Sequence, residues 1–232
     1  MLEIYVSGIE KNSGKTLVTA GLAATMQSLG YDTCVYKPVQ TGAIVKDGFA
    51  QAPDLAFVKF IDPYIKTYFS YLFQSEDIPL LASEKEDTII NPEILYSDYK
   101  SITEYECIIT DGALGLSTPF AKDFLEQNLV KGLDVPVLFV VNNESVNNIV
   151  ANINEAALYG VKTRGVVINN STGHVDKTLP RLIESYTNAK VVGIVPYFDN
   201  LKNINPNDLI SNTLEGIDIE SVFDVKIAKL EG

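Results

Sequence analysis

Glycine, lysine and hydroxyl residues near the start of the chain have the chemistry needed to hold the phosphates of a nucleotide. The segment Gly8–Thr16 (G-I-E-K-N-S-G-K-T) lies between an apolar run and an amphipathic stretch. Between a strand and a helix, successive backbone N–H groups of such a loop point at one spot and bind an anion. Lys15 would reach the terminal phosphate oxygens, and the Thr16 hydroxyl would complete the coordination of Mg²⁺. The segment therefore predicts binding of a nucleoside triphosphate with magnesium, through Asn12, Ser13, Gly14, Lys15, Thr16 and Leu17.

The first glycine of this loop lies one residue from its usual position. The pattern G-x-x-x-x-G-K-[ST] requires a glycine where the chain has Ile9, and the glycine is Gly8 instead. Gly14 would let the backbone pass close to a phosphate, because it has no Cβ atom. Two alternatives stay open. The G-K-T sequence could have arisen by chance, or the loop could have kept its shape but lost the ability to bind phosphate.

The elements that must position this loop form an alternation of short apolar runs and longer amphipathic stretches. The runs lack polar alternation, as expected for parallel strands covered on both faces. The amphipathic stretches Thr16–Leu29 and Ser145–Tyr159 are each followed by a glycine, which is typical of a helix end. We therefore expect one α/β domain over residues 1–232, with a doubly wound, mostly parallel sheet and helices on both faces. The predicted strands are Leu2–Val6, Thr33–Tyr36, Glu106–Thr110, Val135–Val141, Thr163–Ile168 and Lys190–Val195.

The segment Gly42–Lys100 does not follow this alternation. It is rich in tyrosine and phenylalanine and contains no clear strand. We expect helices and loops there, inserted beside the carboxyl ends of the strands, where open α/β sheets bind their ligands.

Composition and charge argue against several classes of partner. The chain has 232 residues and a formal net charge of −12. Nucleic acids and anionic membranes both attract basic surfaces, so we expect neither as a partner. No signal peptide precedes the first loop, and no apolar run approaches the ~20 residues that span a bilayer, which favours a cytoplasmic protein.

Cys34 and Cys107 lie in apolar runs and are expected to be buried thiols, and His174, the only histidine, is expected in a loop.

The loop and a second segment together resemble a known enzyme family. A glycine followed by five residues and then G-K-T is similar to the first loop of dethiobiotin synthetase and its relatives, which include cobyrinate-type amide synthases and the septum-site and partition ATPases. The segment Lys37–Gly42 (K-P-V-Q-T-G) resembles the K-P-V-[AQ]-[ST]-G signature of dethiobiotin synthetase itself. This second match narrows the resemblance to that family and implies a P-loop NTPase-like fold.

Further segments resemble the same family in chain order. They are the acidic residue Asp54 after Pro53, the strand end Asp111-Gly112-Ala113-Leu114, the strand end at Asn169, and the segment Gly193–Tyr197, which contains Val195, Pro196 and Tyr197. The resemblance covers most of the chain and is weakest over residues 43–100. It implies that Asn169 lies on the adenine side of the nucleotide and that Val195–Tyr197 also bind the nucleotide.

The resemblance implies an ATP- and Mg²⁺-dependent cyclo-ligase that acts on a 7,8-diaminononanoate skeleton, as a homodimer. One amine would trap CO₂ as a carbamate, the carbamate would attack the γ-phosphate of ATP, and the second amine would close a cyclic urea. Lys37 places a cation where charge accumulates in such a reaction. Thr41 can hydrogen-bond the carbamate or amine, and Asp54 and Asp111 offer hard oxygen ligands for Mg²⁺ beside Thr16. Lys37, Lys15 and Thr41 are thus the implied catalytic residues.

Structural roles compete with these assignments. Lys37 could be a surface lysine at a strand end, and Asp54 could be the N-cap of a helix that follows Pro53. Asp111 could serve a turn before Gly112, and Asn169 could cap a turn with Asn170.

The chain also departs from the family pattern on the substrate side. Asn12 replaces an acidic residue of the first loop, and Asp111 replaces a glutamate, which leaves both direct and water-mediated metal coordination open. Asp77–Leu80 replaces an S-P-H-type segment, and Asn142–Ser145 replaces a K-x-G-type turn. These departures fit either a divergent synthetase or a relative with a changed substrate.

Two other functions remain as alternatives. A related amide synthase is disfavoured because neither cysteine lies in the sequence context of a glutaminase nucleophile. A nucleotide-dependent switch of the partition type is disfavoured because Glu10 occupies the position of its second lysine.

Overall fold

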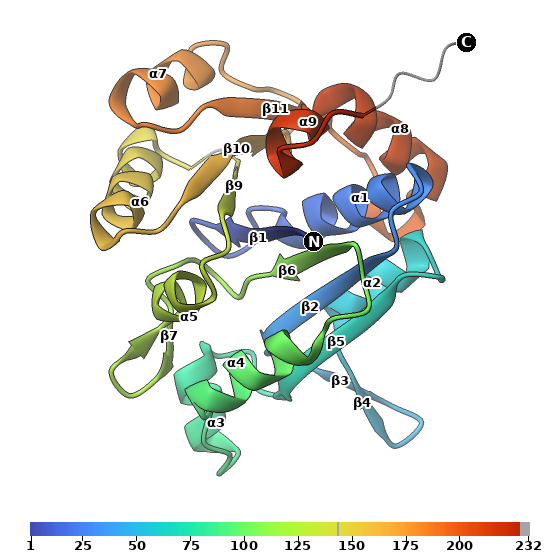
Figure 1. Ribbon diagram of the computed structural model, residues 1–232, viewed down its shortest axis with the longest axis vertical. Coiled ribbons are helices and arrows are strands. Elements are labelled where there is room, and N and C mark those ends of the chain that lie inside the picture. Colours follow the sequence, from blue (N-terminus) through green and yellow to red (C-terminus); the bar gives the residue numbers. More distant parts are fainter. Residues whose placement is uncertain (143, 228–232) are drawn as a thin grey trace.

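A parallel sheet of seven strands forms the centre of the protein (Figure 1). The computed structural model describes residues 1–142 and 144–227. The strand order is β11-β10-β9-β1-β6-β2-β5, and every neighbouring pair is parallel. This confirms the predicted doubly wound α/β fold. The strands are β1 (Leu2–Gly8), β2 (Thr33–Gln40), β5 (Lys66–Leu72), β6 (Cys107–Asp111), β9 (Val137–Val141), β10 (Thr163–Asn169) and β11 (Val191–Val195).

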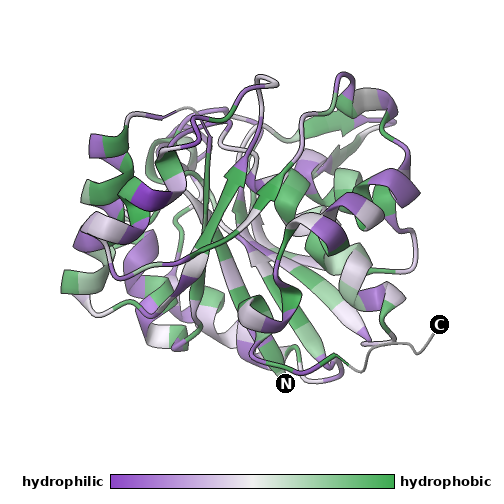
Figure 2. Ribbon diagram, turned by 90° about the horizontal axis from the view of Figure 1, so that it is seen from above, coloured by the Kyte–Doolittle hydropathy of each residue, from purple (hydrophilic) through white to green (hydrophobic). Residues whose placement is uncertain are grey.

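Helices cover both faces of the sheet, and Figure 2 shows the hydrophobic strands running between them. One face packs against α1 (Lys15–Ser28), α2 (Pro53–Ile61), α8 (Pro206–Gly216) and α9 (Ile219–Phe223). The other packs against α4 (Pro92–Ser101), α5 (Glu126–Leu133), α6 (Val146–Tyr159) and α7 (Leu179–Tyr186). None of the helices in the described ranges has the length and apolar character needed to cross a membrane.

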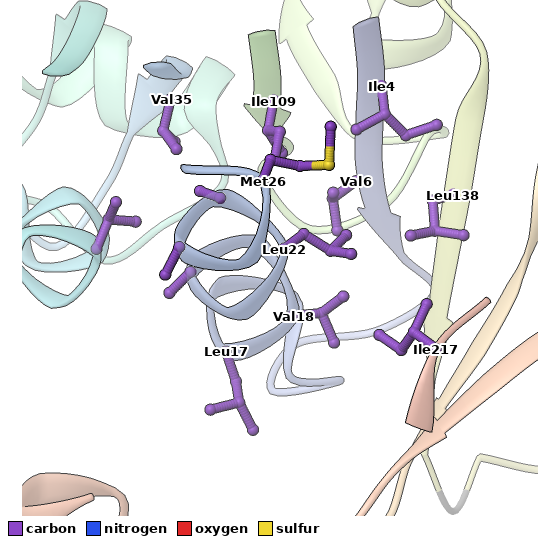
Figure 3. Packing of buried hydrophobic residues seen from close by; sticks show 14 of the residues in the cluster. Ile4, Val6, Leu17, Val18, Leu22, Met26, Val35, Ile109, Leu138 and Ile217 are labelled. Carbon is purple, nitrogen blue, oxygen red and sulfur yellow. The ribbon is translucent and has the colours of Figure 1, made fainter. Parts of the chain in front are cut away.

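The apolar character of the strands follows from this double cover. Ile4 and Val6 of β1 belong to the cluster under α1, whereas Tyr5, between them, belongs to the cluster on the opposite face. Figure 3 shows Leu22 and other residues of α1 packed against the face of the sheet that carries Ile4 and Val6. Because every position of such a strand is buried, a strand of this kind is a continuous apolar run in the sequence. Cys34 and Cys107 are buried free thiols, as predicted.

The prediction that residues 42–100 contain no strand was wrong. Three helices do lie in this segment, namely α2, α4 and α3 (Pro79–Lys85), but β5 also lies there, at the edge of the sheet. Every position of β5 is half-buried or exposed, and its sequence (K-T-Y-F-S-Y-L) mixes polar with aromatic residues. Aromatic residues favour strands, but an edge strand need not form a purely apolar run. The segment adds a small exposed hairpin, β3 (Ile44–Lys46) and β4 (Phe49–Gln51).

Three short elements complete the fold. β7 (Pro119–Ala121) and β8 (Phe124–Leu125) form a second hairpin that leads into α5, and the 3₁₀ helix η1 (Leu201–Asn203) precedes α8. β1, β2 and β6 lie side by side in the sheet, so the segments that follow their carboxyl ends meet at one edge. The three strands end at Gly8, Gln40 and Asp111.

Candidate active site

The phosphate-binding loop predicted from the sequence runs from the end of β1 to the start of α1. Gly14 precedes the helix with a φ of 96°, in the left-handed region that favours glycine. A Cβ atom on Gly14 would lie 2.0 Å from Asn169 Nδ2, and one on Gly8 would lie 2.3 Å from Ser13 Oγ. Neighbouring groups are therefore too close for a side chain at either position, Asn169 at Gly14 and Ser13 at Gly8. The glycine at position 8, one residue from the usual pattern, thus allows the close approach of Ser13 and Lys15.

Lys15 is the first residue of α1 and is buried beneath the loop. Its Nζ atom donates a hydrogen bond of 3.4 Å to the carbonyl of Leu114, in the segment that follows β6. Burial lowers the pKa of Lys15, because desolvation disfavours its charged form. An anionic phosphate at this position would favour the ammonium form again.

Lys37 lies at the centre of a buried network of charges. β2 pairs with β6 only as far as Tyr36, so Lys37 lies beyond the point where the two strands are joined. Its Nζ atom is 2.8 Å from Asp111 Oδ2, 2.8 Å from Asp54 Oδ2 and 2.8 Å from the Gly112 carbonyl. Burial alone would lower the pKa of Lys37, but the attraction of Asp111 and Asp54 outweighs it and raises the pKa. The alternative of a surface lysine is wrong, because only 3% of the side chain is exposed.

Asp111, the last residue of β6, accepts hydrogen bonds from α1 as well. Its Oδ1 atom accepts from the Thr19 hydroxyl at 3.3 Å and its Oδ2 atom from the Thr16 hydroxyl at 3.4 Å. Burial raises the pKa of Asp111, although Lys37 acts in the opposite direction. The carboxylate thus joins the start of α1 to Lys37, a role beyond that of a turn residue.

Asp54 reaches the same lysine from α2. Ala52 is the N-cap residue of that helix and Pro53 its first residue, so the alternative of Asp54 as N-cap is wrong. Burial would raise the pKa of Asp54, but the charge of Lys37 and their hydrogen bond lower it. Asp54 is therefore ionised and paired with Lys37.

The oxygen donors in this network fit a hard divalent cation. The described residues contain no group of three or more His, Cys, Asp and Glu side chains suited to a metal. Mg²⁺ does not need such a group, because it keeps several waters and binds through one or two carboxylates. The two aspartates share one ammonium group, and Thr16 Oγ1 lies 3.4 Å from Asp111. This set of donors is compatible with the Mg²⁺ ligands predicted from the sequence.

A buried glutamate supports the segment after β6 and was missed by sequence reasoning. Glu126 is the first residue of α5 and is fully buried. Its Oε1 atom accepts hydrogen bonds from the Tyr5 hydroxyl at 2.8 Å and from the Ala113 N–H at 2.9 Å. Burial raises the pKa of Glu126. Glu126 lies outside every motif, and the only signal in the sequence is a glutamate at the start of an amphipathic helix.

Most of the predicted site residues surround one cavity of about 730 Å³ at the carboxyl edge of the sheet. Ser13, Asp111 and Gly112 do not line it, but Asp111 and Gly112 bind Lys37, which does. The predicted residues that line it are Asn12, Gly14, Lys15, Thr16, Leu17, Lys37, Thr41, Asp54, Ala113 and Leu114. The sequence analysis missed other lining residues, which include Lys11, Gln40, Phe57, Glu76 and Leu201.

The remaining residues predicted to bind the nucleotide lie outside this cavity, at the carboxyl ends of β10 and β11. Asn169 is buried, and its Nδ2 atom donates a hydrogen bond of 3.0 Å to the Ser13 carbonyl. It therefore contacts the phosphate-binding loop. Val195 is buried in the core, and Pro196 and Tyr197 follow at the surface. The structure thus places these residues on the far side of the loop from Lys37.

Known proteins resemble the chain in both sequence and fold. A protein-family model described as AAA domain (AAA_26) matches residues 3–205. The ATP-dependent dethiobiotin synthetase BioD of Nitrosopumilus maritimus is 29% identical over 96% of this chain and 100% of its own length. That of Fusobacterium nucleatum is 32% identical over 74% of this chain and 80% of its own.

Among solved structures, the cell division ATPase MinD of Pyrococcus furiosus has a TM-score of 0.56 at 18% identity, covering 94% of this chain and 90% of its own. At that identity the likeness shows the fold alone, whereas the synthetases match in sequence over most of the chain. The chain therefore belongs to the AAA domain family and, within it, to the dethiobiotin synthetase family of P-loop ATP-dependent ligases.

Proposed function

We propose that the protein uses ATP to carboxylate a vicinal diamine of the 7,8-diaminononanoate type with CO₂ and to close it to a cyclic urea. The observation that carries this proposal is the position of Lys37. Its ammonium group is bound by two aspartates and a carbonyl, on the wall of the cavity that Lys15 and Thr41 also line. A fixed cation between the phosphate loop and a substrate cavity suits a reaction in which two anions must meet.

The proposed reaction has three steps. An amine of the substrate adds to CO₂, loses a proton and becomes a carbamate. A carbamate oxygen then attacks the γ-phosphorus of ATP, and the bond from that phosphorus to ADP breaks. The second amine attacks the carbonyl carbon and expels phosphate, which closes the cyclic urea with loss of a second proton.

The side chains around the cavity would bring the two anions together. Lys15 binds the terminal phosphates, and Lys37 lies where the carbamate approaches them. Both lysines are buried, and a buried charge acts more strongly than one in water. Thr41, the residue after β2, would hydrogen-bond the carbamate or the amine. Positioning and neutralisation of charge are most of what phosphoryl transfer requires.

Thr16, Asp54 and Asp111 would hold Mg²⁺, which when bound neutralises charge on the phosphate oxygens. Asn169 would lie beside the adenine, and Val195–Tyr197 would contact the nucleotide. For Asn169, the proposal is supported by its hydrogen bond to the Ser13 carbonyl, which links it to the phosphate loop.

The proposal is tested by supplying diaminononanoate, bicarbonate and Mg·ATP and detecting the cyclic urea by mass spectrometry. We expect urea and ADP in equal amounts, with both lost when the diamine is omitted. Folded protein that binds ATP but forms no urea would refute the proposed substrate.

A further inference from the structure

Among the residues that the structure describes, two carboxylates line the substrate cavity, those of Asp54 and Glu76, and only the first is paired with a buried cation. Asp54 shares the ammonium group of Lys37 with Asp111, which does not line the cavity, and both carboxylates lie 2.8 Å from it. Asn12, in the first loop, also lines the cavity but carries no charge. The remaining carboxylate among the described lining residues is Glu76. Glu76 is paired only with an exposed lysine, Lys11, whereas Asp54 is paired with the buried Lys37. A cationic group that enters the cavity can therefore bind Glu76 more readily than Asp54.

The backbone holds Glu76 beside Thr41. The Gly42 N–H donates to the Ser75 carbonyl at 2.8 Å, and the Ala43 N–H donates to the Phe73 carbonyl at 2.8 Å. These bonds join the segment after β2 to the segment after β5. On the other side, Glu86 accepts a hydrogen bond of 2.8 Å from the Ser75 N–H. The loop that carries Glu76 is thus fixed from both sides.

The side chain of Glu76 lies at the mouth of the cavity, opposite the first loop. Its Cγ atom is 3.5 Å from the position that a Cβ atom on Gly42 would occupy. Its Oε2 atom is 3.8 Å from Lys11 Nζ, and the two side chains are 83% and 63% exposed. An exposed ion pair of this length contributes little to stability, so a ligand could displace Lys11 at small cost.

We infer that Glu76 is the residue that recognises an ammonium group of the diamine substrate at the mouth of the cavity, before that group releases a proton to solvent and reacts as a neutral amine. This inference rests on the proposed function. Glu76 takes the role of an acidic contact that Asn12 cannot provide, and the exchange of Lys11 for the substrate ammonium keeps the carboxylate paired. The substrate class is accordingly a cationic amine, held between Glu76 and Thr41.

The test compares Glu76→Gln with the matched control Glu84→Gln. Glu84 is an exposed glutamate on the nearby helix α3 and does not line the cavity, so the control makes the same change of charge outside it. We expect Glu76→Gln to raise the KM for the diamine about 3- to 10-fold, as for a charge-assisted contact at an exposed site. The KM for ATP should stay the same. Glu76→Asp should restore part of the loss, and Glu76→Lys should exceed it.

Two further measurements separate the inference from the proposed function. Calorimetric titration with diaminononanoate, in the presence of Mg²⁺ and a non-hydrolysable ATP analogue, measures binding without turnover. The difference between Glu76→Gln and wild type should shrink in high salt, because the contact is exposed.

Each outcome decides one statement. Urea formation with equal diamine KM values in Glu76→Gln and Glu84→Gln overturns the inference and leaves the proposed function standing. Diamine binding that depends on Glu76, without any urea, supports the inference and refutes the proposed reaction. A wild-type protein that neither binds nor converts the diamine refutes both.

Discussion

Replacing Lys37 by methionine removes the charge at the centre of the network and keeps an unbranched, apolar side chain of similar length in its place. In wild type the Lys37 ammonium group compensates two carboxylates at 2.8 Å, and the side chains of Lys37 and Asp111 are only 3% and 2% exposed. The variant Lys37→Met leaves both aspartates without this cation. Protein stability and catalysis should therefore both change, for different reasons.

The magnitude of the stability change follows from burial. Removing one partner of a buried ion pair typically costs about 3–5 kcal/mol, because it leaves a charge without compensation. The Asp54 side chain is 29% exposed and water can reach it, so we expect the lower end, about 3 kcal/mol, for the free energy of unfolding. The double variant Lys37→Met/Asp111→Asn also removes the buried negative charge. It should regain about 2 kcal/mol of this loss.

The assay has two parts, both on the same proteins. Unfolding in the denaturant urea, in the absence of Mg²⁺, gives the free energy of unfolding, and a separate measurement gives the turnover rate. Both variants should turn over about 10²–10⁴-fold more slowly than wild type while still binding ATP. The control variant is Lys59→Met, which makes the same replacement of lysine by methionine at an exposed position of α2. If the double variant regained turnover together with stability, Lys37 would act only by neutralising Asp111, and its proposed role toward the carbamate would be refuted.

Three further variants test other parts of the site. Lys15→Ala should abolish triphosphate binding in a calorimetric titration, and near-normal turnover would contradict the role of the phosphate loop. Asp111→Asn should raise the Mg²⁺ concentration needed for half-maximal velocity, and an unchanged requirement would leave Asp111 with a structural role only. Burial raises the pKa of Glu126 above its ordinary value of 4.5, so the native state binds this proton more tightly than the unfolded chain. Between these two pKa values, the contribution of Glu126 lowers the free energy of unfolding as pH rises, by at most about 1.4 kcal/mol per pH unit. Glu126→Gln should lack this contribution in urea unfolding at a series of pH values, and parallel curves would contradict it.

The sequence was sufficient to predict strands that are buried on both faces. β1, β6, β9 and β10 are continuous apolar runs because helices cover them on each side, and their predicted bounds agree with the structure within two residues. The edge strand β11 was also predicted, from its apolar sequence, although it is only partly buried. β5 is not such a run, because it pairs with β2 alone and exposes part of its surface. Its side chains therefore satisfy a weaker constraint, and apolar patterning was not able to identify it.

The same reasoning explains which site residues could be predicted. The loop at Gly8–Thr16 and the segment Lys37–Gly42 are contiguous motifs at strand ends, and parallel strands bring such ends to one edge of the sheet. The pairing of Lys37 with Asp111 joins residues 74 positions apart, and it depends on the adjacency of β2 and β6 in the sheet. Glu126 and Glu76 lie on elements that carry no motif, so only the folded chain shows what they contact.

The protein has a net charge of −12, so the groups around the loop must supply the attraction for a triphosphate locally. Lys37 is compensated by Asp54 and Asp111, so the buried network carries a net charge of about −1 before Lys15 is counted. Lys15, with its lowered pKa, brings this sum only to about zero. Side chains alone therefore give little net attraction for a polyanion. The backbone N–H groups of the loop and a divalent cation must supply the rest. This is why the Asp111→Asn titration with Mg²⁺ tests the site more directly than loss of turnover alone.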